Sequence, residues 1–110
     1  MRNSFANTTG ESMNKREKSQ LYHKAFAKWG IDAQTVVLME ECAELIQVAS
    51  KLYRNDIWSP QLADHLAEEI ADVEIMIEQF KVFDFGELAK KVERVKAEKL
   101  KRLAEVLQNG

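Results

Sequence analysis

The stretch LMEECAEL, Leu38–Leu45, sets three glutamates among apolar residues that recur with a helical period. At about 100° per residue, Glu41 falls inside the apolar stripe of this segment and Glu44 falls on its edge. Glu40 lies further round, at the boundary of the stripe. An amphipathic helix normally turns its acids to water. Here the pattern instead predicts a helix that presents carboxylates on or beside its buried face.

A second acidic stretch, LAEEIADVEIM, follows at Leu66–Met76. On the same helical projection Glu69 lies inside the apolar stripe and Asp72 flanks it. Glu74 and Glu78 fall on the other side, which predicts that they face solvent. The acids of both stretches are thus sorted, and four of them belong to the core side of two consecutive helices.

The rest of the chain also indicates helices. One proline and four glycines in 110 residues predict an all-α fold of one small domain. Residues 1–13 are polar and read as a loose arm, so the domain spans 14–110. Four helices are expected, the middle two being a long antiparallel central pair, over residues 14–28, 32–54, 59–81 and 84–107.

Local signals mark the expected helix ends. Gly30 is placed to end the first helix, and Asp32 to cap the second. Ser59 caps the third helix, with Pro60 in its first turn. Asp84 and Glu87 have the spacing of a capping box for the fourth.

Charge and composition exclude several classes of protein. The net charge is −2, but residues 31–84 hold three Lys/Arg against twelve acids, between two basic ends. No apolar run has the length of a membrane span, and no signal peptide is apparent, so a cytoplasmic protein without membrane contact is expected. Cys42 is the single cysteine, which excludes an intrachain disulfide.

Carboxylates on a core face need a positive partner. Four acids converging on one site would raise each other's pKa values, and a hard divalent cation would relieve this. Oxygen ligands favour Mg²⁺, with Mn²⁺ as a substitute. The alternative is that the few cations of the central helices, Lys51, Arg54 and Lys81, pair with the acids. His65, one turn before Glu69, is a candidate fifth ligand or a capping or core histidine.

These residues match a known family pattern. Glu40-Glu41-x-x-Glu44 followed by Glu69-x-x-Asp72 resembles the EExxE…ExxD motif of the all-α nucleoside triphosphate pyrophosphohydrolases, the MazG-like superfamily. The resemblance covers about residues 25–103. The text EECAELIQVASK and LAEEIADVEIMIEQ is most similar to the short, single-domain members of bacteria and their phages.

The resemblance implies a reaction, a cofactor and an assembly. Members cleave a nucleoside triphosphate between its α- and β-phosphates, giving a monophosphate and pyrophosphate, often to remove unwanted nucleotides. It implies Mg²⁺ held by Glu41, Glu44, Glu69 and Asp72. Glu40 would be an auxiliary ligand or water-positioning base, so that Glu40 and Glu41 are the catalytic candidates. It also implies a homodimer or homotetramer that completes the four-helix unit.

Basic residues are expected to meet the phosphates. Lys99-x-x-Arg102 resembles a basic pair that family members carry near this point, and Lys51 is a further candidate. Arg102 can make a forked contact to phosphate, whereas Lys99 acts as a point charge. The alternative is an ordinary solvated amphipathic helix with i,i+4 ion pairs.

Other functions remain as alternatives. Phosphoribosyl-ATP pyrophosphohydrolase shares the fold and a similar use of acidic residues. The stretch beginning at Asp72 is nevertheless closer to the MazG-like pattern. A carboxylate di-iron bundle needs Glu-x-x-His pairs, which this chain lacks. A non-enzymatic helical interaction module is the third alternative. Nucleic-acid binding is not expected, because acids interrupt the basic C-terminal helix.

Overall fold

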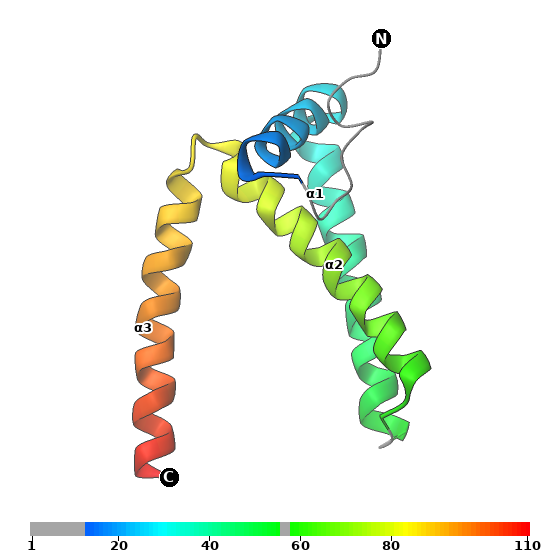
Figure 1. Ribbon diagram of the computed structural model, residues 1–110, viewed down its shortest axis with the longest axis vertical. Coiled ribbons are helices and arrows are strands. Elements are labelled where there is room, and N and C mark those ends of the chain that lie inside the picture. The colour runs from blue at the N-terminus through cyan, green and yellow to red at the C-terminus, as the bar shows by residue number, and fades with distance from the viewer. Residues whose placement is uncertain (1–12, 56–57) are drawn as a thin grey trace.

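The computed structural model describes residues 13–55 and 58–110 as three helices in a row (Figure 1). They are α1 (Lys15–Asn55), α2 (Pro60–Phe83) and α3 (Glu87–Asn109). No strand occurs within the described ranges, which confirms the all-α class predicted from the sequence. Residues 1–12 of the predicted N-terminal arm lie outside the described residues.

Gly30 bends α1 without ending it. Its φ of 83° and ψ of 163° are not helical, yet the residues on both sides stay in helix. The predicted first and second helices are therefore two arms of one kinked element, the first arm being residues 15–29 and the second arm residues 31–55. Asp32, predicted as an N-cap, lies inside α1. The predicted break at Gly30 is confirmed, and the second arm begins at residue 31, next to the expected start at Asp32.

Replacing Gly30 by Ala is expected to lower the free energy of unfolding by about 1–3 kcal/mol, because this backbone region is essentially restricted to glycine. A Cβ at this position would meet nothing within 4 Å, so the loss comes from the backbone and not from a clash. Urea unfolding measures it. Gly86→Asn is the control, since Gly86 is left-handed (φ 86°, ψ 2°) and asparagine tolerates that region. Equal stability of Gly30→Ala and the unmutated chain would contradict the kink.

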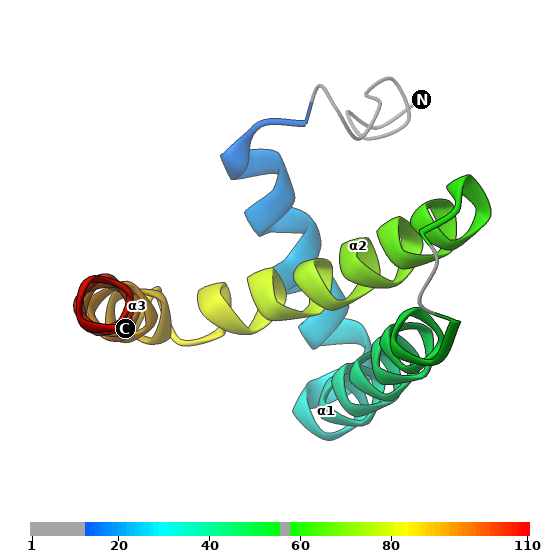
Figure 2. The same cartoon turned by 90° about the horizontal axis from the view of Figure 1, so that it is seen from below.

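The second arm of α1 and α2 form the central pair. α2 runs back alongside the second arm in the opposite direction (Figures 1 and 2). The buried apolar side chains of this pair are Val48, Leu62, Val73 and Met76. Val48 is 2% exposed, but among the described residues no side chain is completely enclosed. The interior that one chain builds is therefore thin.

The first arm crosses α2 near its C-terminal end (Figure 2). Phe26 packs against Phe80 and Phe83, with ring centroids 5.4 and 4.9 Å apart. The buried Tyr22 hydroxyl donates a hydrogen bond to the Glu78 carboxylate. The expectation that Glu78 faces solvent is thus wrong, because the kink at Gly30 folds the first arm over this side of α2.

The caps set the limits of α2 and α3. The Leu62 amide donates to Ser59 Oγ at 3.1 Å and Pro60 occupies the first turn, as predicted. Asp84, predicted to cap the fourth helix, is instead the C-cap of α2. Gly86 is the N-cap of α3, which begins at Glu87. The Leu88 amide still donates to Asp84 Oδ1 at 2.9 Å, so Asp84 satisfies one free amide of the α3 start.

α3 extends away from the central pair (Figure 1). None of its residues is buried. Near its start, Lys81 of α2 lies 4.0 Å from Glu93 of α3, and beyond this the two helices diverge. Among the described residues, no helix has the length and apolar composition needed to cross a membrane.

Candidate metal centre

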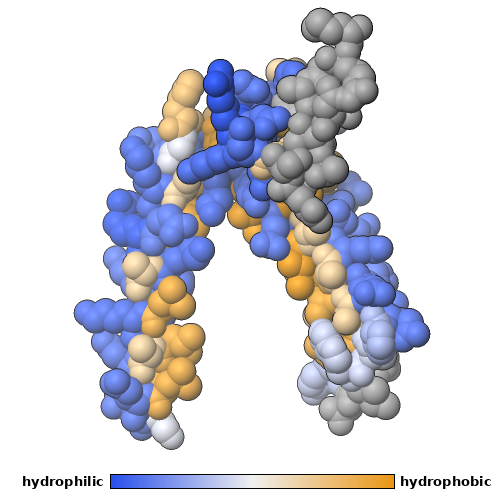
Figure 3. Space-filling view, viewed as in Figure 1, coloured by the Kyte–Doolittle hydropathy of each residue, from blue (hydrophilic) through white to orange (hydrophobic). Residues whose placement is uncertain are grey.

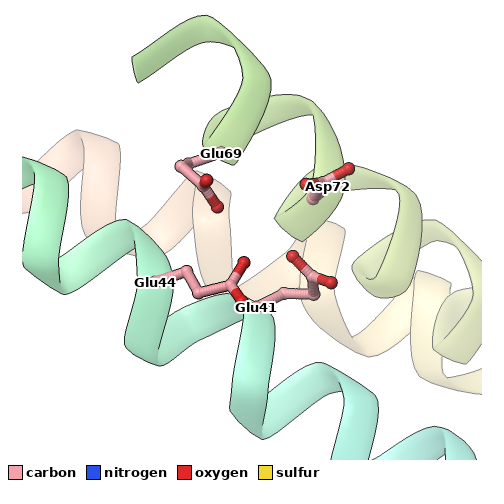
Figure 4. A group of neighbouring side chains, drawn as sticks. All are labelled: Glu41, Glu44, Glu69 and Asp72. Carbon is pink, nitrogen blue, oxygen red and sulfur yellow. The ribbon is translucent and has the colours of Figure 1, made fainter. Parts of the chain in front are cut away.

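Four carboxylates meet between the central helices. Glu41 and Glu44 project from consecutive turns of the second arm of α1, and Glu69 and Asp72 from consecutive turns of α2 (Figure 4). One oxygen from each lies within 4.8 Å of the others. Because i,i+3 residues share a helix face, each helix supplies one half of the group. We call these four residues the acidic cluster.

The acidic cluster has a buried side and an exposed side. Glu41 Oε2 and Glu69 Oε2 are buried and have no hydrogen-bond partner. Glu44 and Asp72 are exposed. A buried carboxylate oxygen without a partner is unfavourable. The protein itself therefore leaves two oxygens of the cluster without an interaction partner. The exposed pair leaves the cluster accessible to an ion.

The two inner carboxyls resist ionisation. The pKa of Glu41 is raised, first by burial and then by the negative charges of Asp72 and Glu44. Burial also raises the pKa of Glu69, followed by the charges of Glu44 and Asp72, while His65 acts in the opposite direction. His65 Nε2 lies 3.8 Å from Glu69 Oε1, and the His65 side chain is partly exposed. A positive charge among the four carboxylates would oppose both causes of these raised pKa values.

The alternative in which lysine or arginine neutralises the cluster has little support. Lys81 pairs with Glu93 of α3. The Arg54 guanidinium donates to Ser50 Oγ at 2.8 Å. Lys51 is exposed, two helical turns beyond Glu44. The donor set of four carboxylates can instead hold a metal ion, and oxygen donors favour a hard one.

The remaining predicted site residues lie at different distances from the cluster. Glu40 is exposed on the flank of α1, next to the cluster but outside it. Lys51 follows on the same side of α1 and faces solvent. Lys99 and Arg102 lie on the distal half of α3, which stays apart from the cluster in both views (Figures 1 and 2). One chain therefore does not bring these two residues to the acids.

Sequence reasoning found all four members of the acidic cluster, but it missed the pairing of Tyr22 with Glu78. These residues are 56 positions apart, and no spacing rule connects them. They come together only because the kink at Gly30 directs the first arm across α2. The signal for the acidic cluster was local, whereas this contact depends on tertiary structure.

Comparison of the chain with protein-family models, with curated proteins and with solved structures finds no significant match.

Proposed function

We propose that the chain is a Mg²⁺-dependent nucleoside triphosphate pyrophosphohydrolase, with Mn²⁺ as a substitute metal. The observation that carries this is the acidic cluster, in which one carboxylate oxygen of each residue lies within 4.8 Å of the others. Glu41 Oε2 and Glu69 Oε2 are also buried without a hydrogen-bond partner. The motif resemblance supplies the reaction, and the convergence of four carboxylates that could hold a metal ion supports it. Removal of unwanted nucleotides in the cytoplasm is the proposed role.

Glu41, Glu44, Glu69 and Asp72 would hold the metal. When bound, it would neutralise phosphate oxygens and favour ionisation of a nearby water. The raised pKa values of Glu41 and Glu69 mean that the free cluster holds protons more tightly than isolated carboxyls do. Binding a cation would displace them, so affinity is expected to increase with pH through the acidic range.

The chain's own residues then have separate tasks. In the reaction, the oxygen of a water molecule bonds to phosphorus while the P–O bond between the α- and β-phosphates breaks. Glu40, beside the cluster, would orient this water and accept its proton. Lys51 would contact the phosphates as a point charge. Lys99 and Arg102 would reach a phosphate only if another copy of the chain supplied them.

Assembly belongs to the same proposal. A homodimer or homotetramer would complete the four-helix unit that the resemblance implies, because no side chain in residues 13–55 and 58–110 is fully enclosed within one chain. Phosphoribosyl-ATP hydrolysis is the alternative activity, since its substrate presents the same α–β linkage to the same carboxylates.

The deciding experiment measures pyrophosphate release from canonical and modified nucleoside triphosphates, with magnesium and with EDTA. Release that depends on magnesium, with a monophosphate as co-product, is the expected result. Release of phosphate instead of pyrophosphate would contradict cleavage at the α–β linkage. Turnover of phosphoribosyl-ATP alone would favour the alternative enzyme, and turnover of neither would overturn the enzymatic proposal.

A further inference from the structure

A cavity lies where the first arm of α1 meets the end of α2 and the start of α3. Its volume is about 600 Å³, which is within the range of small-molecule sites. Figure 3 shows mostly hydrophilic side chains gathered over the first arm, at the top of the view. We call this space the junction cavity, and its main lining residues are Lys15, Lys18 and Tyr22 of the first arm, Lys81 and Val82 of α2, and Ala89 of α3.

The junction cavity is separate from the acidic cluster. On the helical projection, Glu78 and Lys81 of the cavity fall about 180° and about 120° from Glu69. Figure 2 shows the first and second arms of α1 on opposite sides of α2. Lys81 is also about 14 Å beyond Asp72 along the helix axis. One small molecule therefore does not contact both places.

Three lysines give the junction cavity its positive charge. Lys81 lies 4.0 Å from a carboxylate oxygen of Glu93. Lys15 and Lys18 are three residues apart, so their side chains share one face of the first arm. Neither of these two side chains forms an ion pair or a hydrogen bond with another described residue. The first arm thus brings two ammonium groups without a counter-charge to one cavity.

The two carboxylates that line the junction cavity have partners of their own. Glu78 accepts a hydrogen bond from the Tyr22 hydroxyl. The pKa of Tyr22 is raised, first by burial and then by the hydrogen bond and charge of Glu78, so the hydroxyl keeps the proton that it donates. Glu93 lies 4.0 Å from Lys81 and 3.8 Å from Lys96. The two unpaired lysines are therefore left to meet an anion from outside.

The lining indicates what kind of anion fits. Two ammonium groups match a phosphate monoester, which carries a charge of about −1.5 to −2 at neutral pH. Lysine is a common phosphate ligand, and the positive end of the α1 dipole lies at Lys15. The Tyr22 ring, Val82 and Ala89 add apolar surface, which inorganic phosphate alone would not use. The cavity therefore suits a phosphate that is attached to a small organic group.

We propose that the junction cavity binds a small phosphate monoester, with the phosphate between Lys15 and Lys18 and the organic group against Val82 and Ala89. Nucleoside monophosphates and sugar phosphates share this chemistry. The junction cavity and the acidic cluster have no residue in common. The inference therefore holds whether or not the chain hydrolyses nucleotides.

Isothermal titration calorimetry of the full chain in EDTA tests the proposal with adenosine 5′-monophosphate, ribose 5-phosphate and adenosine. Without a divalent metal, the carboxylates of the acidic cluster repel a phosphate, so binding there is not expected. At least one of the two phosphates should bind with a Kd below about 1 mM. Adenosine should bind at least tenfold more weakly than adenosine 5′-monophosphate if the nucleotide is the preferred ligand, and not at all if ribose 5-phosphate is. Binding of neither phosphate, or equal binding of adenosine and its monophosphate, would overturn the proposal.

Lys18→Gln tests the phosphate contact. It should weaken binding of the preferred phosphate at least tenfold, because it removes one of the two unpaired charges. Lys28→Gln is the matched control, since it makes the same change in charge on the first arm. Lys28 lies over the Trp29 ring and does not line the cavity. Equal losses in the two variants would indicate general attraction to a basic helix and would overturn the proposal.

Ala89→Phe tests the cavity itself, because it keeps every charge and fills the space for the organic group. It should also weaken binding at least tenfold, whereas Ala97→Phe, at an exposed position of α3, should not. Amide NMR spectra of the unmutated chain locate the ligand independently of any substitution. The largest shifts are expected at the residues that line the junction cavity. Largest shifts at the acidic cluster, or full affinity in Ala89→Phe, would overturn the proposal.

Discussion

Asp72→Asn and Glu44→Gln are each expected to reduce pyrophosphate release at least about a hundredfold, because each would remove a charged ligand of the proposed metal ion. Both carboxylates are exposed members of the acidic cluster. Neither substitution changes the size of the side chain much, so the fold should persist. Steady-state turnover with magnesium and circular dichroism measure the two effects.

Glu74→Gln is the matched control for these substitutions. Glu74 lies on α2 only two residues after Asp72, is exposed, and is not part of the acidic cluster. It should keep its turnover. Full magnesium-dependent turnover in both Asp72→Asn and Glu44→Gln would exclude the acidic cluster as the site of the reaction.

Magnesium is expected to raise the free energy of unfolding of the chain by about 3 kcal/mol when its concentration is a hundred times the dissociation constant. Glu41→Gln should remove most of this gain, because Glu41 supplies a buried oxygen that has no other partner. Urea unfolding at several magnesium concentrations measures it. Glu74→Gln should respond to magnesium as the unmutated chain does. Equal gains in all three proteins would contradict metal binding at the acidic cluster.

The same variant should behave differently without metal. The pKa of Glu41 is raised above its ordinary value of 4.5, so the folded chain binds this proton more tightly than the unfolded chain. Stability from this proton is present below pH 4.5 and is lost as pH rises through the raised value. At neutral pH, Glu41→Gln should therefore be more stable than the unmutated chain in EDTA. A loss of stability there would mean that the carboxylate has a partner.

The helical period in the sequence was enough to predict the acidic cluster. Glu41 and Glu69 fall inside apolar stripes, and residues three positions away on the same helix complete the group. The cap at Ser59 was equally local, and the structure confirms it. What these features share is that each depends on residues within one or two turns.

Features that depend on the direction of a whole element could not be predicted in this way. Gly30 gives the same sequence signal whether the helix ends or bends, and only packing of the first arm on α2 distinguishes the two. For that reason Glu78 was expected in solvent.

The absence of any buried residue on α3 has a thermodynamic consequence. α3 contacts the rest of its chain only near its start, where Glu93 lies 4.0 Å from Lys81 of α2. Its distal part therefore depends on local propensity, whereas most helical stability in proteins comes from tertiary packing. If a second copy provides the missing contacts, association and helix formation become one coupled equilibrium. Dilution would then melt residues 87–109 while the central pair stays folded. The concentration of the chain would thus regulate how much of it is ordered.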